Sequence, residues 1–395
     1  MTSTPRSIGE RIAAARKRRG LTQVALARLT HYSRPHIAQV ETDNKAATPA
    51  FISAVAAALA VDPAELYGQP YRGETPGADR VHAAIAELRR ALVWVDIPPE
   101  RDAPPRSLDQ IAADLATCQN LRRAAQHTRL GTLLPALIEE LTHHTHDHGT
   151  SRAWWLLFSA FETAGELTRR LGYTDLAGQI MERSAVAAAH AEDPILPLMV
   201  TRRRALLMSN AAADRAAVRM LTAAADSVDH THPGADEAAG SLHLRAAVVA
   251  ARAGDASTAW DHYNEARSVS RRAGQQPLDR YLTNFVPGNI TIHGCAIAVE
   301  LRDWDEAARR SAAVTDTVLR SVSPERQAHH RIDTARAHQE TGHRDAALDE
   351  LLAADRTAPQ MTRYHPSARS VAAHLATGYR DLPEPLRILM SRMHL

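Results

Sequence analysis

Apolar residues recur three and four positions apart along the chain, which is the spacing of helices that bury one face. Within the first 68 residues this spacing, together with capping residues, predicts five short helices. The first helix buries Ile8, Ile12 and Ala15 and stops before Gly20. The other four begin near Thr22, near Ser33, near Pro49 and after Asp62-Pro63.

The rest of the chain repeats a pattern of helix pairs. Small residues at a fixed spacing predict two antiparallel helices that cross closely, and stacked pairs expose a concave surface formed mainly by the first helix of each pair. The pattern Gly-x-x-x-x-Ala occurs at Gly172–Ala177, Gly254–Ala259 and Gly342–Ala347, lacks its glycine at Arg302–Ala307, and is weaker around Ala217. Another small residue follows seven positions later, with Val314 as an imperfect match.

Composition supports an all-helical chain. Only 4% of the residues are aromatic, which is low for a large β-sandwich or barrel, and alanine, the best helix former, is abundant. The first 68 residues hold nine Arg or Lys against five Asp or Glu, a net charge of +4, which leaves −2 for the remainder. A small basic head therefore precedes a long, nearly neutral body.

Proline and glycine separate the head from the body. Residues 69–80 are too rich in both to continue a helix and predict a linker. The expected fold is all-α, with a five-helix helix-turn-helix domain at residues 1–68 and an α-solenoid of antiparallel helix pairs at 81–395.

The second and third predicted helices of the head are separated by a tight turn. Two such helices inside a basic bundle are a DNA-binding arrangement. At 100° per residue, Ile37 and Val40 of the third helix point inward. The outward arc holds Arg34, Pro35, Ala38, Gln39 and Thr42.

Arg34 and Gln39 carry the chemistry for reading bases. Arg donates two hydrogen bonds to guanine and Gln pairs with adenine in the major groove, each worth about 1–3 kcal/mol of discrimination. We expect these two side chains to be the base readers. Pro35 cannot donate a hydrogen bond but can touch a thymine methyl group.

Several spaced positions of the head form one pattern: Leu21-Thr22-Gln23-x-x-Leu26-Ala27, Ser33-Arg34-x-x-Ile37-x-x-Val40-Glu41, Asn44, and Pro49 followed seven residues later by Ala56. With this pattern, residues 7–68 resemble the phage-repressor-like (XRE) helix-turn-helix regulators. The resemblance implies that Gln23, Ser33, Asn44 and Lys45 hold DNA phosphates and that Arg16 forms a structural ion pair with Glu41.

His31 departs from that family pattern, which usually has glycine in the turn. The left-handed backbone that the turn requires is less costly for histidine than for most residues.

The repeat units resemble the tetratricopeptide repeat, and the whole layout resembles one-component regulators, including peptide-sensing quorum regulators of Gram-positive bacteria. This resemblance implies a homodimer that holds two heads at a half-site spacing of about 34–36 Å and a body that senses a peptide or small molecule. The body contains few asparagines, which argues against an extended peptide because such a ligand needs side-chain amides for its backbone groups.

A candidate effector site lies at Asn284, Asn289 and His293. Pro287-Gly288 breaks the chain, and Asn289 is then placed to cap a helix that carries His293 one turn further on. The segment resembles a Phe-x-Pro-x-Asn-x-x-x-His stretch of actinobacterial regulators. The alternative is that Asn289 only caps its helix and His293 packs in the interior.

Other candidate chemistry is sparse. The run from His143 to His148 places His144, Asp147 and His148 within one helical turn, which suits a metal ion but equally a solvated helix end. No glycine-rich phosphate loop, Gly-x-Ser-x-Gly or His-Glu-x-x-His motif occurs. We expect neither an enzyme nor a cofactor, and a metal-responsive regulator stays an alternative.

Two cysteines, Cys118 and Cys295, make no disulfide framework and suit a reducing cytoplasm. No apolar run reaches membrane-spanning length, and the start lacks a secretory pattern. The expected protein is a cytoplasmic regulator that binds double-stranded DNA. A helical-repeat adaptor whose head binds protein is the competing class, and it would show no salt-dependent affinity for DNA.

Overall fold

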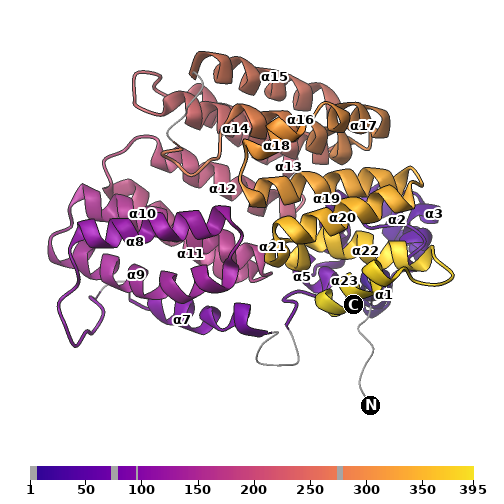
Figure 1. Ribbon diagram of the computed structural model, residues 1–395, viewed down its shortest axis with the longest axis horizontal. Helices are drawn as coiled ribbons and strands as arrows, with labels where there is room; N and C mark the ends of the chain where they lie inside the picture. Colours follow the sequence, from indigo (N-terminus) through magenta and orange to yellow (C-terminus); the bar gives the residue numbers. More distant parts are fainter. Residues whose placement is uncertain (1–6, 73–78, 95–96, 274–278) are drawn as a thin grey trace.

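The computed structural model describes residues 7–72, 79–94, 97–273 and 279–395; part of the predicted linker, residues 73–78, lies outside the described residues. The fold is all-α, and the described ranges contain no strand (Figure 1). All five predicted helices of the head are confirmed, and Ser7, Thr22, Ser33, Thr48 and Asp62 cap them with their side chains. They are α1 (Ile8–Arg18), α2 (Gln23–Thr30), α3 (Arg34–Glu41), α4 (Pro49–Leu59) and α5 (Pro63–Tyr67).

The body is built from antiparallel helices of mostly 13 to 21 residues, and shorter helices fill its ends. A 3₁₀ turn, η1 (Arg80–His82), precedes it. The helices are α7 (Ala84–Ala91), α8 (Leu108–Arg123), α9 (His127–Asp147), α10 (Ser151–Arg170), α11 (Thr174–His190), α12 (Leu196–Asn210), α13 (Asp214–Asp226), α14 (Ala235–Arg252), α15 (Ala256–Ala273), α16 (Pro287–Leu301), α17 (Trp304–Ala312), α18 (Asp316–Arg320), α19 (Pro324–Glu340), α20 (Arg344–Thr357), α21 (Pro359–Tyr364), α22 (Pro366–Thr377) and α23 (Glu384–Met393).

The repeated alanines lie at the crossings of the helix pairs. Ala217, Ala259, Ala307 and Ala347 are completely buried, at the contacts of α12 with α13, α14 with α15, α16 with α17 and α19 with α20. Each pair turns through a left-handed residue where the pattern has glycine, and Arg302 takes this conformation where glycine is missing. Val314, the imperfect match, lies beyond the end of α17.

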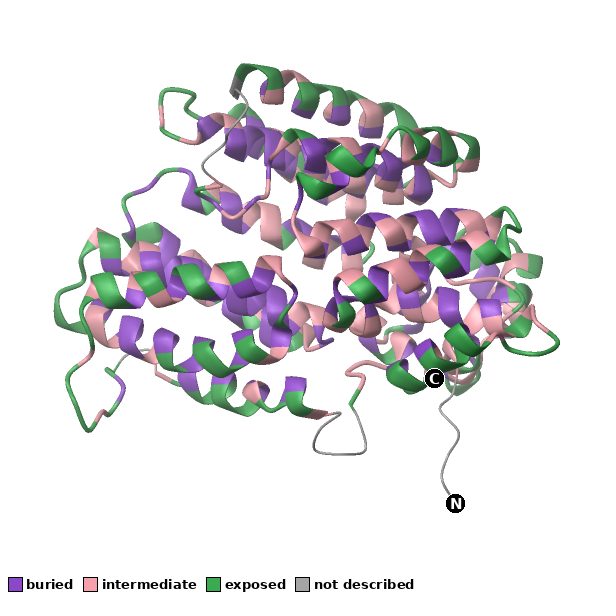
Figure 2. Ribbon diagram, in the orientation of Figure 1, coloured by how far each residue is buried: buried purple, intermediate pink, exposed green. Residues whose placement is uncertain are grey.

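The stack of helix pairs curves back on itself around the concave surface that the sequence predicts. Arg170 of α10 contacts Glu325 of α19, and the amide of Thr128 donates to Gln360 over 3.0 Å. Arg123 at the end of α8 also pairs with Asp279, 2.6 Å away. The last helices thus return to the first ones, and buried residues face inward around the molecule (Figure 2).

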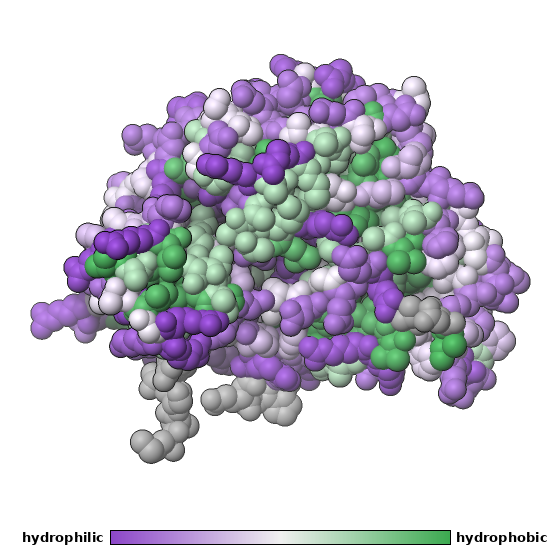
Figure 3. Space-filling model, turned by 180° about the vertical axis from the view of Figure 1, so that it is seen from behind, coloured by the Kyte–Doolittle hydropathy of each residue, from purple (hydrophilic) through white to green (hydrophobic). Residues whose placement is uncertain are grey.

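On the face opposite to Figure 1, hydrophilic residues surround scattered hydrophobic patches (Figure 3). No helix in the described ranges is both long and apolar enough to cross a bilayer.

Enlarging a crossing alanine tests this packing. Ala259→Leu inserts three carbons where the Cβ is fully buried, so we expect the free energy of unfolding to fall by about 1–3 kcal/mol in urea titrations. Ala256→Leu, one turn earlier on the exposed side of α15, is the matched control and should change stability by less than about 0.5 kcal/mol. Equal losses in both variants would contradict the predicted crossing.

Candidate functional site

Helix α3 presents the predicted reading surface to solvent. Ile37 and Val40 are buried in the core of the head, as the helical spacing predicts. Within the described part of the chain, the side chains of Arg34 and Gln39 have no hydrogen-bond partner. Of the five residues on the outward arc, Arg34, Pro35, Gln39 and Thr42 are exposed and Ala38 is half-buried.

The ends of α3 are fixed by short hydrogen bonds. Ser33 is the N-cap and accepts from the amide of His36 over 3.3 Å, so its hydroxyl hydrogen remains for a phosphate. At the other end the Thr42 hydroxyl donates to the carbonyl of Ala38 and accepts from the Asn44 amide, both over 2.9 Å. These contacts hold the predicted phosphate-binding residues of this loop, Asn44 and Lys45, close to the C-terminus of α3.

A buried ion pair locks α3 to α1. Arg16 donates Nε to Glu41 Oε1 over 2.6 Å and Nη2 to Glu41 Oε2 over 2.9 Å, a bidentate geometry. The amide of Gln23 adds a third donor to Glu41 at 2.9 Å and keeps a second N–H for a phosphate. Burial favours a raised pKa for Glu41, but the hydrogen bonds from Arg16 and Gln23 and the Arg16 charge lower it below its usual value.

The turn before α3 adopts the left-handed conformation that glycine would supply. His31 ends α2 with φ of 57° and ψ of 23°, as expected for the family pattern.

The head packs against the body. Arg302, at the end of α16, lies 5.5 Å above the ring of Tyr32 and reaches Tyr32 Oη and Thr48 Oγ1 over 3.4 Å. Thr174 of α11 donates to Asp62 at the start of α5 over 2.9 Å. The outward arc of α3 stays exposed in this arrangement, so docking leaves the reading surface free.

Helix α5 closes a central cavity of about 310 Å³. Its Ala64 and Tyr67, with Pro49 and Ser53 of α4, line one side. The rest of the wall comes mainly from α10, α12, α14, α16 and α19, the first helices of their pairs. The helices that the sequence assigns to the concave surface therefore do line this cavity, which stays partly open to solvent.

The three predicted effector contacts all border this cavity. Asn289 does not cap α16, because the helix begins at Pro287 and its N-cap is Val286. The Asn289 amide instead donates to the carbonyl of Asn284 and accepts from Arg326 Nε, both over 2.7 Å. His293 Nδ1 lies 2.7 Å from the Asn289 carbonyl, and burial with the Arg326 charge lowers the pKa of His293 well below its usual value.

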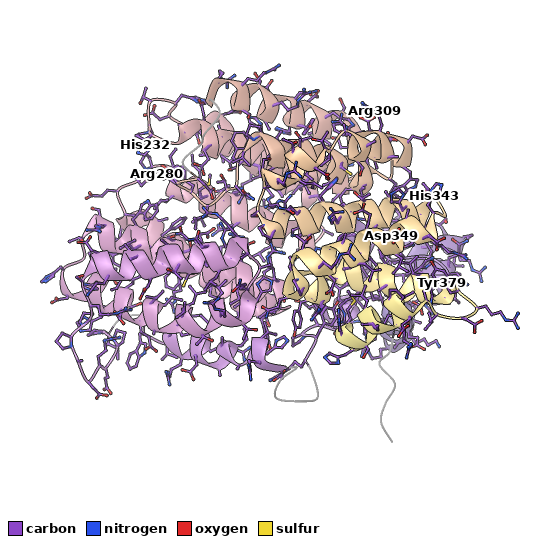
Figure 4. All side chains as sticks on the ribbon, viewed as in Figure 1. His232, Arg280, Arg309, His343, Asp349 and Tyr379 are labelled. Atoms are coloured by element: carbon purple, nitrogen blue, oxygen red, sulfur yellow. The ribbon has the colours of Figure 1, made fainter. Side chains whose placement is uncertain are left out.

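The loop that carries Asn284 is anchored to Asp193. Tyr281 Oη donates to this carboxylate over 3.3 Å, and Arg280 and His232 lie beside it, at 3.5 and 4.0 Å (Figure 4). Glu237 accepts from the backbone amides of Arg280 and Tyr281. The cavity wall at Asn284 is therefore held by charged groups outside the cavity.

Comparison with known proteins identifies the head. Residues 7–66 match the family model of a helix-turn-helix domain. Neither a curated protein nor a solved structure matches the chain. The match covers the segment whose caps, turn and buried residues are described above, and the body has no counterpart among these comparisons.

Outside the helix-turn-helix domain, the histidine run ends α9. His144 Nε2 lies 2.7 Å from the backbone carbonyl of Arg106, and His148 is paired with Asp147. The described ranges contain no cluster of three or more His, Cys, Asp or Glu side chains arranged to hold a metal ion.

Breaking the buried pair of the helix-turn-helix domain should cost far more than breaking an exposed one. Arg16→Gln leaves the Glu41 carboxylate buried without its cation, so we expect a loss of about 3–5 kcal/mol in the free energy of unfolding. Arg18→Gln, which removes the exposed pair with Glu65, should cost less than about 1 kcal/mol. Urea unfolding at pH 7 measures both; similar losses would show that the Arg16 pair has no special role.

His36 makes the stability of the helix-turn-helix domain depend on pH. Burial, with the charges of Lys45 and Arg302, lowers its pKa from 6.5 to about 4. In the unfolded chain His36 binds its proton at higher pH than in the folded protein. The stability that neutral His36 contributes is therefore complete above about pH 6.5 and is lost as the pH falls towards 4. His36→Phe keeps a ring beside Tyr32 and Phe51 and should reduce the fall of the urea midpoint between pH 7 and pH 5, whereas exposed His146→Phe should not.

Proposed function

We propose that the protein is a sequence-specific transcription regulator that reads the major groove with α3. The observation that carries this proposal is the exposed arc on α3. Among the residues that the structure describes, Arg34 and Gln39 have no side-chain partner there, while Ile37 and Val40 fix the rotation of the helix. The helix-turn-helix match to residues 7–66 supports DNA as the partner.

Phosphate contacts set the register of this proposed complex. Ser33 and Gln23 each keep an N–H or O–H donor beside the start of α3 or α2, and Lys45 supplies a cation at the far end. Binding should therefore weaken steeply as salt increases, because each neutralised phosphate releases counterions.

The body, in this proposal, forms a homodimer and senses an effector. A dimer would place two heads at half-sites about 34–36 Å apart, one turn of the DNA helix. The cavity between the head and the body supports an effector role, since a ligand held there contacts both parts. Such a ligand changes DNA affinity only as far as its own affinity differs between two arrangements of head and body.

The test is loss of sequence preference in a double variant. Arg34→Ala with Gln39→Ala should reduce the ratio of operator to random-DNA affinity by roughly 10- to 100-fold per lost base contact, measured by gel shift with an operator found by in vitro selection. Arg28→Ala on α2, also exposed, is the matched control and should keep the preference.

Two results would contradict the proposed function. One is an unchanged preference in the double variant. The other is DNA affinity of the intact chain that does not depend on salt, which would favour a protein-binding head.

A further inference from the structure

The central cavity carries an excess of positive charge. Eight arginines border it, against four carboxylates. The carboxylates form ion pairs with only some of the arginines. Glu166 pairs with Arg122 at 3.1 Å and with Arg170 at 2.7 Å, and Glu325 also pairs with Arg170. Glu300 pairs with Arg336 behind the wall at 3.1 Å. Most of these carboxylates are therefore already paired with some of the arginines and do not neutralise the others.

Three arginines on successive first helices are left without an acidic partner. Within the described ranges, Arg169 of α10, Arg202 of α12 and Arg245 of α14 have no carboxylate within 4.0 Å. The Nε groups of Arg169 and Arg245 are buried and have no hydrogen-bond partner there. Arg202 Nε reaches only the carbonyl of Ser241, at 3.4 Å. Such half-buried cations without a counter-charge are rare, because removing even part of a charge from water is costly unless it is paired.

These three charges repel one another. Burial and neighbouring arginines lower the pKa of Arg169 to about 9 and of Arg202 to about 10. The pKa of Arg245 is lowered by burial and then by Arg202, Arg203, Arg169 and Arg252, all of them cations. Guanidinium groups stay protonated at neutral pH, so the cavity keeps a positive electrostatic potential.

Asp333, the remaining carboxylate of the wall, does not relieve this potential. Burial and the nearby Glu300 raise its pKa to about 7, so it is partly protonated at neutral pH. Water can satisfy the free N–H groups but cannot cancel their charge.

We propose that the cavity binds a compact polyanion, a small molecule with two or more phosphate or carboxylate groups, through Arg169, Arg202 and Arg245. Guanidinium forks match both kinds of oxyanion, and three of them exceed what a single monoanion can neutralise. The volume of about 310 Å³ lies at the lower end of ligand pockets, which suits a small molecule better than an extended peptide.

The bound anion also neighbours the DNA-binding head. Tyr67, Ala64 and Ser53 line the same cavity, so occupancy acts on the contact between head and body. This second step, a change in DNA affinity, rests on the proposed function; anion binding itself does not.

Calorimetric titration of the full chain tests the site, with pyrophosphate and citrate as polyanions and acetate as the monoanion at matched ionic strength. We expect saturable binding of at least one polyanion and none of acetate. At 100 times Kd the polyanion should raise Tm by about 3 °C. Binding of pyrophosphate but not citrate would show that the site prefers phosphate groups, and the reverse would show that it prefers carboxylates. If neither polyanion binds, the proposal is overturned.

Variants on the cavity wall separate this site from other basic surfaces. Arg169→Gln and Arg245→Gln should each weaken polyanion binding at least tenfold, and without anion their Tm should equal or exceed that of the wild type, because an isolated half-buried cation is removed. Arg204→Gln, on α12 but exposed and paired with Glu182, is the matched control and should bind normally.

Undiminished binding in both cavity variants would overturn the proposal, as would binding that is lost in Arg34→Ala on the DNA-reading surface. Gel shifts of the wild type with and without the polyanion then test the coupling. Absence of DNA binding under both conditions would contradict the proposed function while the calorimetric result stands by itself.

Discussion

Arg170 joins α10 to α19, and the central cavity depends on that junction. Its guanidinium contacts Glu166 on its own helix and Glu325 on α19, 155 residues away in the chain. Burying such charges costs several kcal/mol per ion unless they are paired, and here each ion has a partner. Burial alone would lower the pKa of Arg170, yet the charges of Glu325 and Glu166 raise it above its usual value. The pair lets two polar helix faces meet, which brings distant helix pairs together around the cavity.

The head borders the same cavity. Its α5 places Ala64 and Tyr67 on the cavity, while Arg302 holds Tyr32 near the start of α3. The same docking leaves Arg34 and Gln39 exposed. The predicted reading surface and the cavity surface therefore belong to one compact head but face different surroundings, which is the arrangement that coupling between two sites requires.

The helices and their buried faces follow from the sequence, whereas the contacts that bring distant helices together do not. Caps such as Ser33, the inward pair Ile37 and Val40, and the crossing alanines act through spacing and size alone, so the helices and their buried faces could be predicted. The Arg170–Glu325 contact joins residues that nothing in the sequence marks as neighbours. Asn289 shows that even a local prediction can fail. The sequence predicts it as the cap of α16, but Pro287 already starts this helix and Val286 is its N-cap. The unpaired arginines could be found only once three helices were placed around one space.

In this structure the body and the head share one charged cavity. Hydrogen exchange of the intact chain, with and without saturating pyrophosphate or citrate, measures how an anion in the cavity acts on both parts, because amide protection reports local stability in each helix. We expect slower exchange in α10, α12 and α14 and, in the same experiment, in α4 and α5 of the head. Protection confined to the body, or no protection in either part, would contradict this expectation.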